Sequence, residues 1–82
     1  MQFKFDFDVF IPGQRVKFIS KYNYRIGYGE TGTIVRHPWG MMTTENVAVD
    51  WDKKETERHD CAGAARNGHG WCVSKRDIEI IF

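Results

Sequence analysis

The amino-acid sequence predicts an all-β fold, a small barrel of about five strands formed by one domain over residues 1–82. Several short segments alternate apolar and polar residues with the two-residue period of a half-buried strand. Glycine, proline and asparagine residues separate these segments, and no segment carries the apolar stripe of a helix of ordinary length. Short strands joined by tight turns favour a barrel, because closure removes the exposed edges of a sheet.

The first expected strand is an N-terminal addition to the barrel. Residues 3–11 alternate phenylalanines with charged residues, and the Pro-Gly pair at 12–13 ends the segment. Residues 15–19 alternate again, so a second strand begins at once. Consecutive β-branched residues favour a strand within 31–37, and the clearest alternation of the chain lies at 45–52.

The remaining strands follow a charged segment at 53–60, which lacks an apolar stripe and is interpreted as a strand edge or a loop. An Asn-Gly turn then precedes a strand at 70–74. A single helical turn over 74–77, of the 3₁₀ type, separates it from a last strand at 78–82. The inward-facing residues of these strands form the expected core: Val16, Phe18, Ile34, Val47, Val49, Trp51, Trp71, Val73 and Ile78.

Four stretches resemble, in order, the strands of an SH3-like barrel: "PGQRVKFI", "GETGTIV", "VAVDWD" and "GHGWCVSKRDIEII". The last is similar to the SH3 ending, in which a Gly-aromatic strand, one 3₁₀ turn and a short final strand follow one another. The second and third are similar to Mind-bomb-type SH3-like repeats, and "HDCxG…GHGWxV" resembles a segment of small phage and bacterial proteins of unassigned role. The resemblance covers about residues 12–82 and implies the fold more than a function.

Composition narrows the function classes. The chain has 12 basic and 11 acidic residues, which excludes the global basicity of a generic nucleic-acid binder. The charged N-terminus lacks the apolar run of a secretory signal, and no stretch reaches the roughly 20 apolar residues of a membrane span. We therefore expect a cytoplasmic protein whose two cysteines are reduced.

Two histidines and both cysteines of the chain lie close together in the sequence, at His59, Cys61, His69 and Cys72. Their side chains are of the type that binds zinc, so a zinc-stabilised adaptor is one alternative. The spacing includes no C-x₂-C or H-x₃-H pair, and the histidines could instead hydrogen-bond to the backbone. We expect no bound metal and no cofactor.

A Cys/His nucleophile would require a thiol of lowered pKa beside a histidine, in a cleft that also supplies oxyanion donors. A chain of 82 residues has little room for such a pocket beside its core. We therefore expect a protein that is not an enzyme.

The segment between the strands at 15–19 and 31–37 is the best candidate for a binding surface, because it mixes tyrosines with basic residues and contains no acid before Glu30. The SH3 resemblance places this loop beside the ligand groove. The expected binding residues are Tyr22, Tyr24, Arg25 and Tyr28, with Trp39 as a second anchor. The alternative is that one or two of the tyrosines cap the core.

The leading interpretation is a non-catalytic protein-interaction module, for example a small phage or bacterial regulator that binds a larger protein. The positive loop predicts a partner with an acidic, partly apolar surface. Single-stranded nucleic-acid binding through the tyrosine and basic residues of the loop is the alternative.

Overall fold

The computed structural model describes residues 10–21, 25–37 and 45–82 and confirms an all-β fold. Two 3₁₀ turns, η1 (Cys61–Gly63) and η2 (Lys75–Asp77), accompany the strands. No helix in these ranges is long and apolar enough to cross a bilayer. The expected N-terminal strand falls almost entirely on residues 1–9, outside the described ranges. The five strands are β1 (Arg15–Phe18), β2 (Thr31–Val35), β3 (Asn46–Trp51), β4 (Gly70–Ser74) and β5 (Ile78–Ile80).

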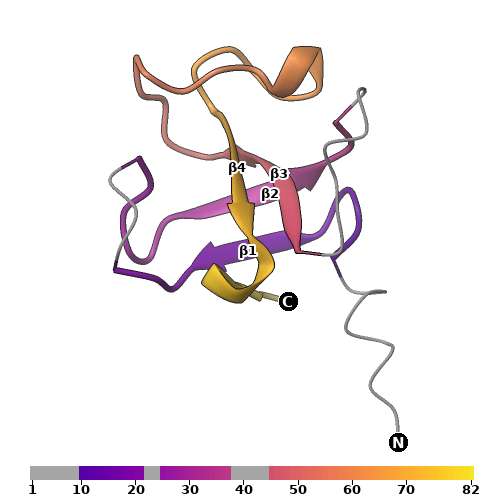
Figure 1. Ribbon diagram of the computed structural model, residues 1–82, viewed down its shortest axis with the longest axis vertical. Coiled ribbons are helices and arrows are strands. Elements are labelled where there is room, and N and C mark those ends of the chain that lie inside the picture. Colours follow the sequence, from indigo (N-terminus) through magenta and orange to yellow (C-terminus); the bar gives the residue numbers. More distant parts are fainter. Residues whose placement is uncertain (1–9, 22–24, 38–44) are drawn as a thin grey trace, which may run out of the picture.

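The strands form one antiparallel sheet in the order β4-β3-β2-β1-β5 (Figure 1). Val16 pairs with Gly32 of β2 on one side and with Ile80 of β5 on the other, so β1 lies between β2 and β5 in the sheet. A closed barrel would require the edge strands β4 and β5 to pair. The strand pairs of the described residues do not include this one, so barrel closure stays a prediction.

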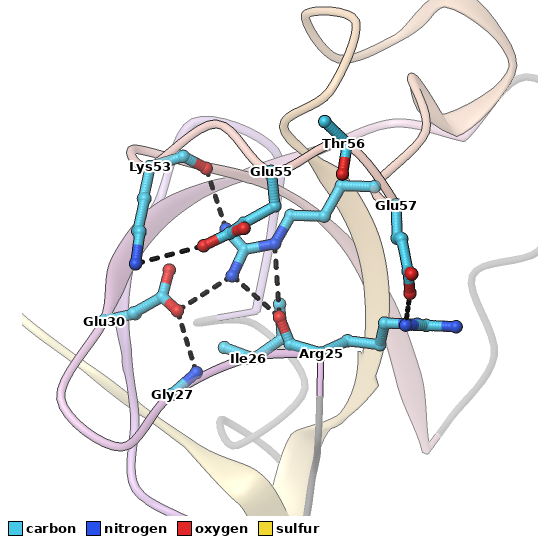
Figure 2. A pocket seen from close by; sticks show the side chains of 9 residues that line it. Arg25, Ile26, Gly27, Glu30, Lys53, Glu55, Thr56 and Glu57 are labelled. Atoms are coloured by element: carbon cyan, nitrogen blue, oxygen red, sulfur yellow. Dashed lines mark hydrogen bonds and ion pairs between the residues drawn. The ribbon is translucent and has the colours of Figure 1, made fainter.

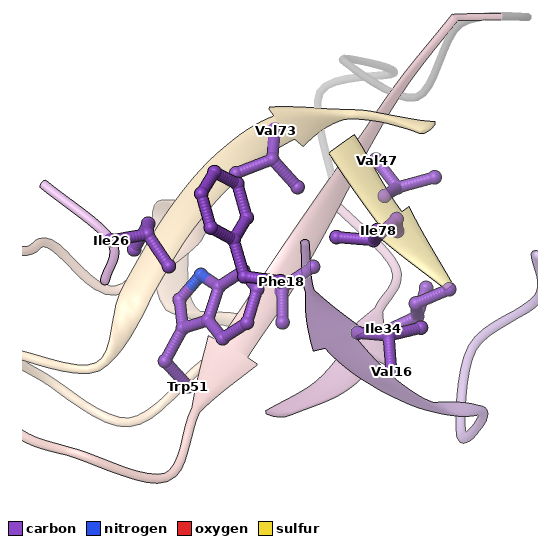
Figure 3. Close-up of a cluster of buried hydrophobic side chains, with 9 residues drawn as sticks. Val16, Phe18, Ile26, Ile34, Val47, Trp51, Val73 and Ile78 are labelled. Carbon is purple, nitrogen blue, oxygen red and sulfur yellow. The ribbon is translucent and has the colours of Figure 1, made fainter. Parts of the chain in front are cut away.

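The alternation of side chains builds the core on one face of the sheet. Trp51 lies fully buried at its centre, edge-on to Phe18 with ring centroids 6.0 Å apart (Figure 3). The indole Nε1 of Trp51 donates a hydrogen bond of 3.3 Å to the carbonyl oxygen of Trp71, so its polar atom is satisfied inside the core. The buried cluster consists of Val16, Phe18, Ile26, Ile34, Val47, Val49, Trp51, Val73 and Ile78.

Two residues differ from the expected core. Trp71 was expected inside, yet it is only half-buried and packs against the margin of the cluster. It lies near the start of β4, directly after Gly70. Ile26 takes a place in the core instead, although it belongs to the segment between β1 and β2 rather than to a strand. This segment thus contributes to stability as well as to surface.

The two 3₁₀ turns have different origins. The expected turn after β4 is η2, and the hydroxyl of Ser74 accepts a hydrogen bond of 3.3 Å from the Arg76 backbone N–H at its start. The turn η1 was not expected. Its residues Cys61 and Ala62 have φ angles of 50° and 58°, the left-handed region in which a residue with a β-carbon is disfavoured.

Candidate functional site

Two segments leave the sheet at the same end and enclose a cavity between them. Residues 19–30 connect β1 to β2, and residues 52–69 connect β3 to β4. The cavity has a volume of about 390 Å³ and is lined by residues 25–27, 30, 53 and 55–58 (Figure 2). We call this surface, together with Tyr28, which follows Gly27 in the chain, the cavity face.

Arg58 braces the cavity from within. Its guanidinium donates to the carbonyl oxygen of Arg25 through Nε and Nη2, at 3.2 and 2.7 Å. Nη1 donates to the carbonyl oxygen of Lys53 at 2.8 Å, and Nη2 also donates to the Glu30 carboxylate at 2.8 Å. Because the planar guanidinium offers donors in several fixed directions, one buried side chain connects both loops.

Glu30 is the anionic partner of Arg58. Its Oε2 atom also accepts a hydrogen bond of 2.8 Å from the backbone N–H of Gly27. Burial raises the pKa of this carboxyl, but the hydrogen bonds from Arg58 and Gly27 outweigh it and the net pKa is lowered. The other carboxylate oxygen, Oε1, is buried and has no hydrogen-bond partner among the described residues.

Two ion pairs flank the buried pair at the rim of the cavity. Lys53 and Glu55 approach to 3.0 Å, and Arg25 pairs with Glu57. The cavity lining therefore contains three basic and three acidic side chains whose charges balance. Among the described residues, the groups that line it are charged side chains and the side chains of Ile26 and Thr56.

Trp71 contacts both loops, through Arg25 of the first and His59 of the second. The Arg25 guanidinium carbon is 5.4 Å from the centroid of a Trp71 ring, within the range of a cation–π interaction. The His59 ring lies 5.1 Å from Trp71 at an interplanar angle of 36°. These contacts account for the half-burial of Trp71 outside the main core.

Of the binding residues expected from the sequence, Arg25 and Tyr28 are described, whereas Tyr22, Tyr24 and Trp39 lie outside the described ranges. Tyr28 is 66% exposed, so this tyrosine does not cap the core. Arg25 is partly buried and is already engaged with Glu57 and Trp71.

The sequence did not reveal the role of the 53–58 segment. Its alternating charges were interpreted as a strand edge or a loop, and it is a loop. Arg58 and Glu30 were not identified, because a buried arginine carries no local pattern that distinguishes it from its exposed neighbours. The one available signal was the absence of an acid between Val9 and Glu30, which marks Glu30 as the first counter-charge for the basic loop.

The four residues of the zinc alternative are divided between different contacts. The Nδ1 atom of His59 accepts a 2.9 Å hydrogen bond from the Cys61 backbone N–H, and the Nδ1 atom of His69 lies 2.7 Å from the Trp51 carbonyl oxygen, to which it donates. Both histidines thus make backbone hydrogen bonds, while the Cys61 thiol lies against the Val49 carbonyl oxygen. The described part of the chain contains no group of three or more His, Cys, Asp or Glu side chains that could hold a metal ion.

The fold and the site define a small all-β domain with a charge-balanced cavity at one end of its sheet. No protein-family model matches the chain, and neither a curated protein nor a solved structure matches it.

Proposed function

We propose that the chain is a non-catalytic protein-interaction module and that the cavity face is its binding surface. The observation that carries this proposal is the combination of a cavity braced by the buried Arg58 with the exposed ring of Tyr28. Exposed aromatic residues beside a rigid pocket are the usual anchors of a protein interface.

Preorganisation favours binding by this surface. The base of the 19–30 loop is closed by backbone hydrogen bonds between Phe18 and residues 29 and 30, at 2.7 Å each. The 52–69 loop is folded on itself by a 2.9 Å hydrogen bond from the Glu55 N–H to the Gly68 carbonyl. A partner would therefore meet a surface whose described residues are already held in place by these hydrogen bonds, which lowers the entropic cost of association.

The partner that suits this surface presents an acidic, partly apolar segment. Lys53 is 66% exposed, and an exposed ion pair such as Lys53–Glu55 contributes little to stability. A carboxylate of the partner can therefore replace Glu55 at Lys53 at small cost. An apolar side chain of the partner would pack on the ring of Tyr28.

An SH3-like identity for the barrel is part of this proposal. It is supported by the strand order β4-β3-β2-β1-β5 and by the succession of β4, η2 and β5, which begins with Gly70 and Trp71. In that fold the segment between the first two strands borders the ligand groove, and here that segment carries Arg25 and Tyr28.

A peptide-binding experiment tests the proposal. The full chain is screened against a library of short peptides that combine acidic and apolar residues, and the best binder is titrated by fluorescence anisotropy. Replacing Tyr28 and Lys53 together by alanine should weaken its binding at least ten-fold, about 1.4 kcal/mol. The melting temperature should stay within a few degrees, because both side chains are exposed.

The matched control removes an apolar and a basic side chain from the opposite end of the sheet, by Ile11→Ala with Arg36→Ala. Both residues are exposed, and Ile11 adjoins the turn whose Gly13 N–H bonds to Ile34 near the end of β2. The proposal is wrong if the two double variants bind the peptide equally well.

Single-stranded nucleic-acid binding through the exposed Tyr28 is separated from peptide binding by its salt dependence. A fluorescent oligothymidine is titrated at two salt concentrations, because phosphate contacts lose affinity steeply as ionic strength rises. Tight, salt-sensitive binding of the oligonucleotide without binding of any peptide would replace the protein-binding proposal with the nucleic-acid one.

A further inference from the structure

A second packed region lies on the side of the sheet opposite the core, over β3 and β4. Ala48 of β3 pairs with Cys72 of β4, and Gly70 lies two residues before Cys72 and so faces the same way. The turn η1 covers this patch, which leaves both Ala48 and Cys61 buried. Cys72 itself is half-buried.

The thiol of Cys61 is held close against the sheet. Its Sγ atom lies 4.0 Å from the carbonyl oxygen of Val49. A β-carbon at Gly70 would lie only 2.8 Å from the same sulfur, so the thiol occupies the space that a side chain would otherwise fill. Cys72 faces the same side of β4 two residues further along, so both cysteines belong to the patch that η1 covers.

We propose that Cys61 and Cys72 are a dithiol that closes to an intramolecular disulfide when the protein meets a peroxide. The pair consists of one fully buried and one half-buried thiol, so the oxidant meets Cys72 first. Cys61 then acts as the resolving thiol, because its sulfur already packs against β4 at Gly70, two residues before Cys72 on the same face of the strand.

The reaction balances in two steps. The Cys72 thiolate attacks one oxygen of hydrogen peroxide, the O–O bond breaks, and a sulfenic acid and hydroxide form. The Cys61 sulfur then attacks the Cys72 sulfur, and the sulfenic oxygen leaves as water with the proton of Cys61. Two thiols are oxidised by two electrons, and one peroxide is reduced to two waters.

The electrostatics of the pair agree with this order. The hydrogen bond from the Cys61 thiol lowers the pKa of Cys72, which favours its nucleophilic thiolate form. The same hydrogen bond, together with burial, raises the pKa of Cys61, which keeps its proton until the second step. The cross-link would tie the 52–69 loop to β4.

Mass spectrometry of the intact full chain tests the proposal. Protein treated with hydrogen peroxide and then alkylated should be monomeric, lighter than the reduced chain by two hydrogen atoms, and free of alkyl groups. Dithiothreitol should restore both alkylation sites. The melting temperature of the oxidised form should rise by about 5 °C or more, because the cross-link restricts the unfolded chain.

Two variants check the order of the steps. Cys61→Ala should leave a Cys72 sulfenic acid that dimedone traps, formed more slowly because this variant lacks the Cys61 thiol that lowers the pKa of Cys72. Cys72→Ala should leave Cys61 unmodified under the same peroxide treatment. Sulfinic or sulfonic acid at Cys72 of the unsubstituted protein, with Cys61 still open to alkylation after denaturation, would overturn the proposal. A disulfide-linked dimer as the main product would also overturn it, and neither result depends on whether the variants fold.

Discussion

Arg58 donates a 2.8 Å hydrogen bond to Glu30 from a position in which the arginine side chain is 1% exposed and the glutamate side chain 18%. This pair joins the loop that follows β1 to the loop that follows β3. The same guanidinium satisfies two backbone carbonyls, those of Arg25 and Lys53. Removing it would therefore leave the two carbonyl oxygens without these donors, and the largely buried carboxylate without its counter-charge and with only the Gly27 N–H as a donor.

We expect Arg58→Ala to lower the free energy of unfolding by about 3–5 kcal/mol, because breaking a buried pair leaves its other member uncompensated. Urea denaturation measures this loss. Arg36→Ala, which removes an exposed arginine, serves as the control and should change stability by no more than about 0.5 kcal/mol. Equal effects of the two substitutions would show that Arg58 is not a bracing residue.

Gly70→Ala is expected to destabilise the domain by about 1–3 kcal/mol through overpacking. The added β-carbon would lie 2.8 Å from Cys61 Sγ and 2.9 Å from the His59 carbonyl oxygen, so η1 would have to shift. Gly27→Ala is the matched control, because its β-carbon would come no closer than 3.4 Å to Glu30. Thermal unfolding compares the two, and the expectation fails if Gly27→Ala is the more harmful change.

Stability should fall in acid through Asp52. Two hydrogen bonds from Arg15, at 2.8 and 2.6 Å, and a third from Thr31 lower the pKa of Asp52 to about 2. A carboxyl whose pKa is depressed by folding contributes stability above its unfolded pKa, and this contribution is lost as the pH falls toward 2. Because Asp52 is almost half exposed, solvent screening limits the contribution to about 1 kcal/mol or less.

Asp52→Asn tests this pH dependence. Urea unfolding of the variant and of the unsubstituted protein should differ most near pH 6 and converge as the pH approaches 2. A difference that stays constant over this range would mean that the Arg15–Asp52 pair does not contribute through ionisation.

Trp51→Ala should cost about 3–5 kcal/mol, because the indole fills the centre of the core and its cavity cannot collapse. Loss of this size removes much of the stability of a small domain. Phe82→Ala, at a fully exposed aromatic residue, should leave unfolding unchanged. Near-ultraviolet circular dichroism and urea titration follow both variants, and a folded Trp51→Ala protein of normal stability would contradict the core assignment.

The strands were predictable because each has a half-buried sheet environment that the alternation of residues records. Val47, Val49 and Trp51 all point into the core, as their spacing indicated. Trp71 was misplaced because periodicity gives the face of a strand but not the distance from the end of the sheet. Ile26 was missed for the complementary reason, since an isolated apolar residue in an irregular segment has no period.

The candidate site was less predictable than the fold. Composition identified the basic loop with Arg25 and Tyr28, but the other wall of the cavity comes from a segment about thirty residues later in the chain. Arg58 acquires its role from hydrogen bonds to the Arg25 carbonyl oxygen in the other loop and to the Lys53 carbonyl oxygen in its own loop, which no local pattern encodes. The position of Cys61 against Gly70 of β4 likewise depends on the left-handed backbone of η1, which forms at Cys61 and Ala62 although neither of these is a glycine.

The pairing of β1 with β5 also bears on how the domain reaches its native state. It brings Val16 against Ile80, which lies 64 residues later in the sequence (80 − 16). This pairing can form only after β5 has returned to β1. Such non-local pairing slows folding, and small all-β domains of this kind fold in milliseconds to seconds. During synthesis, the apolar side chains of β1 therefore lack their second neighbouring strand until β5 has been made, and such an unpaired strand edge is open to wrong partners in the nascent chain.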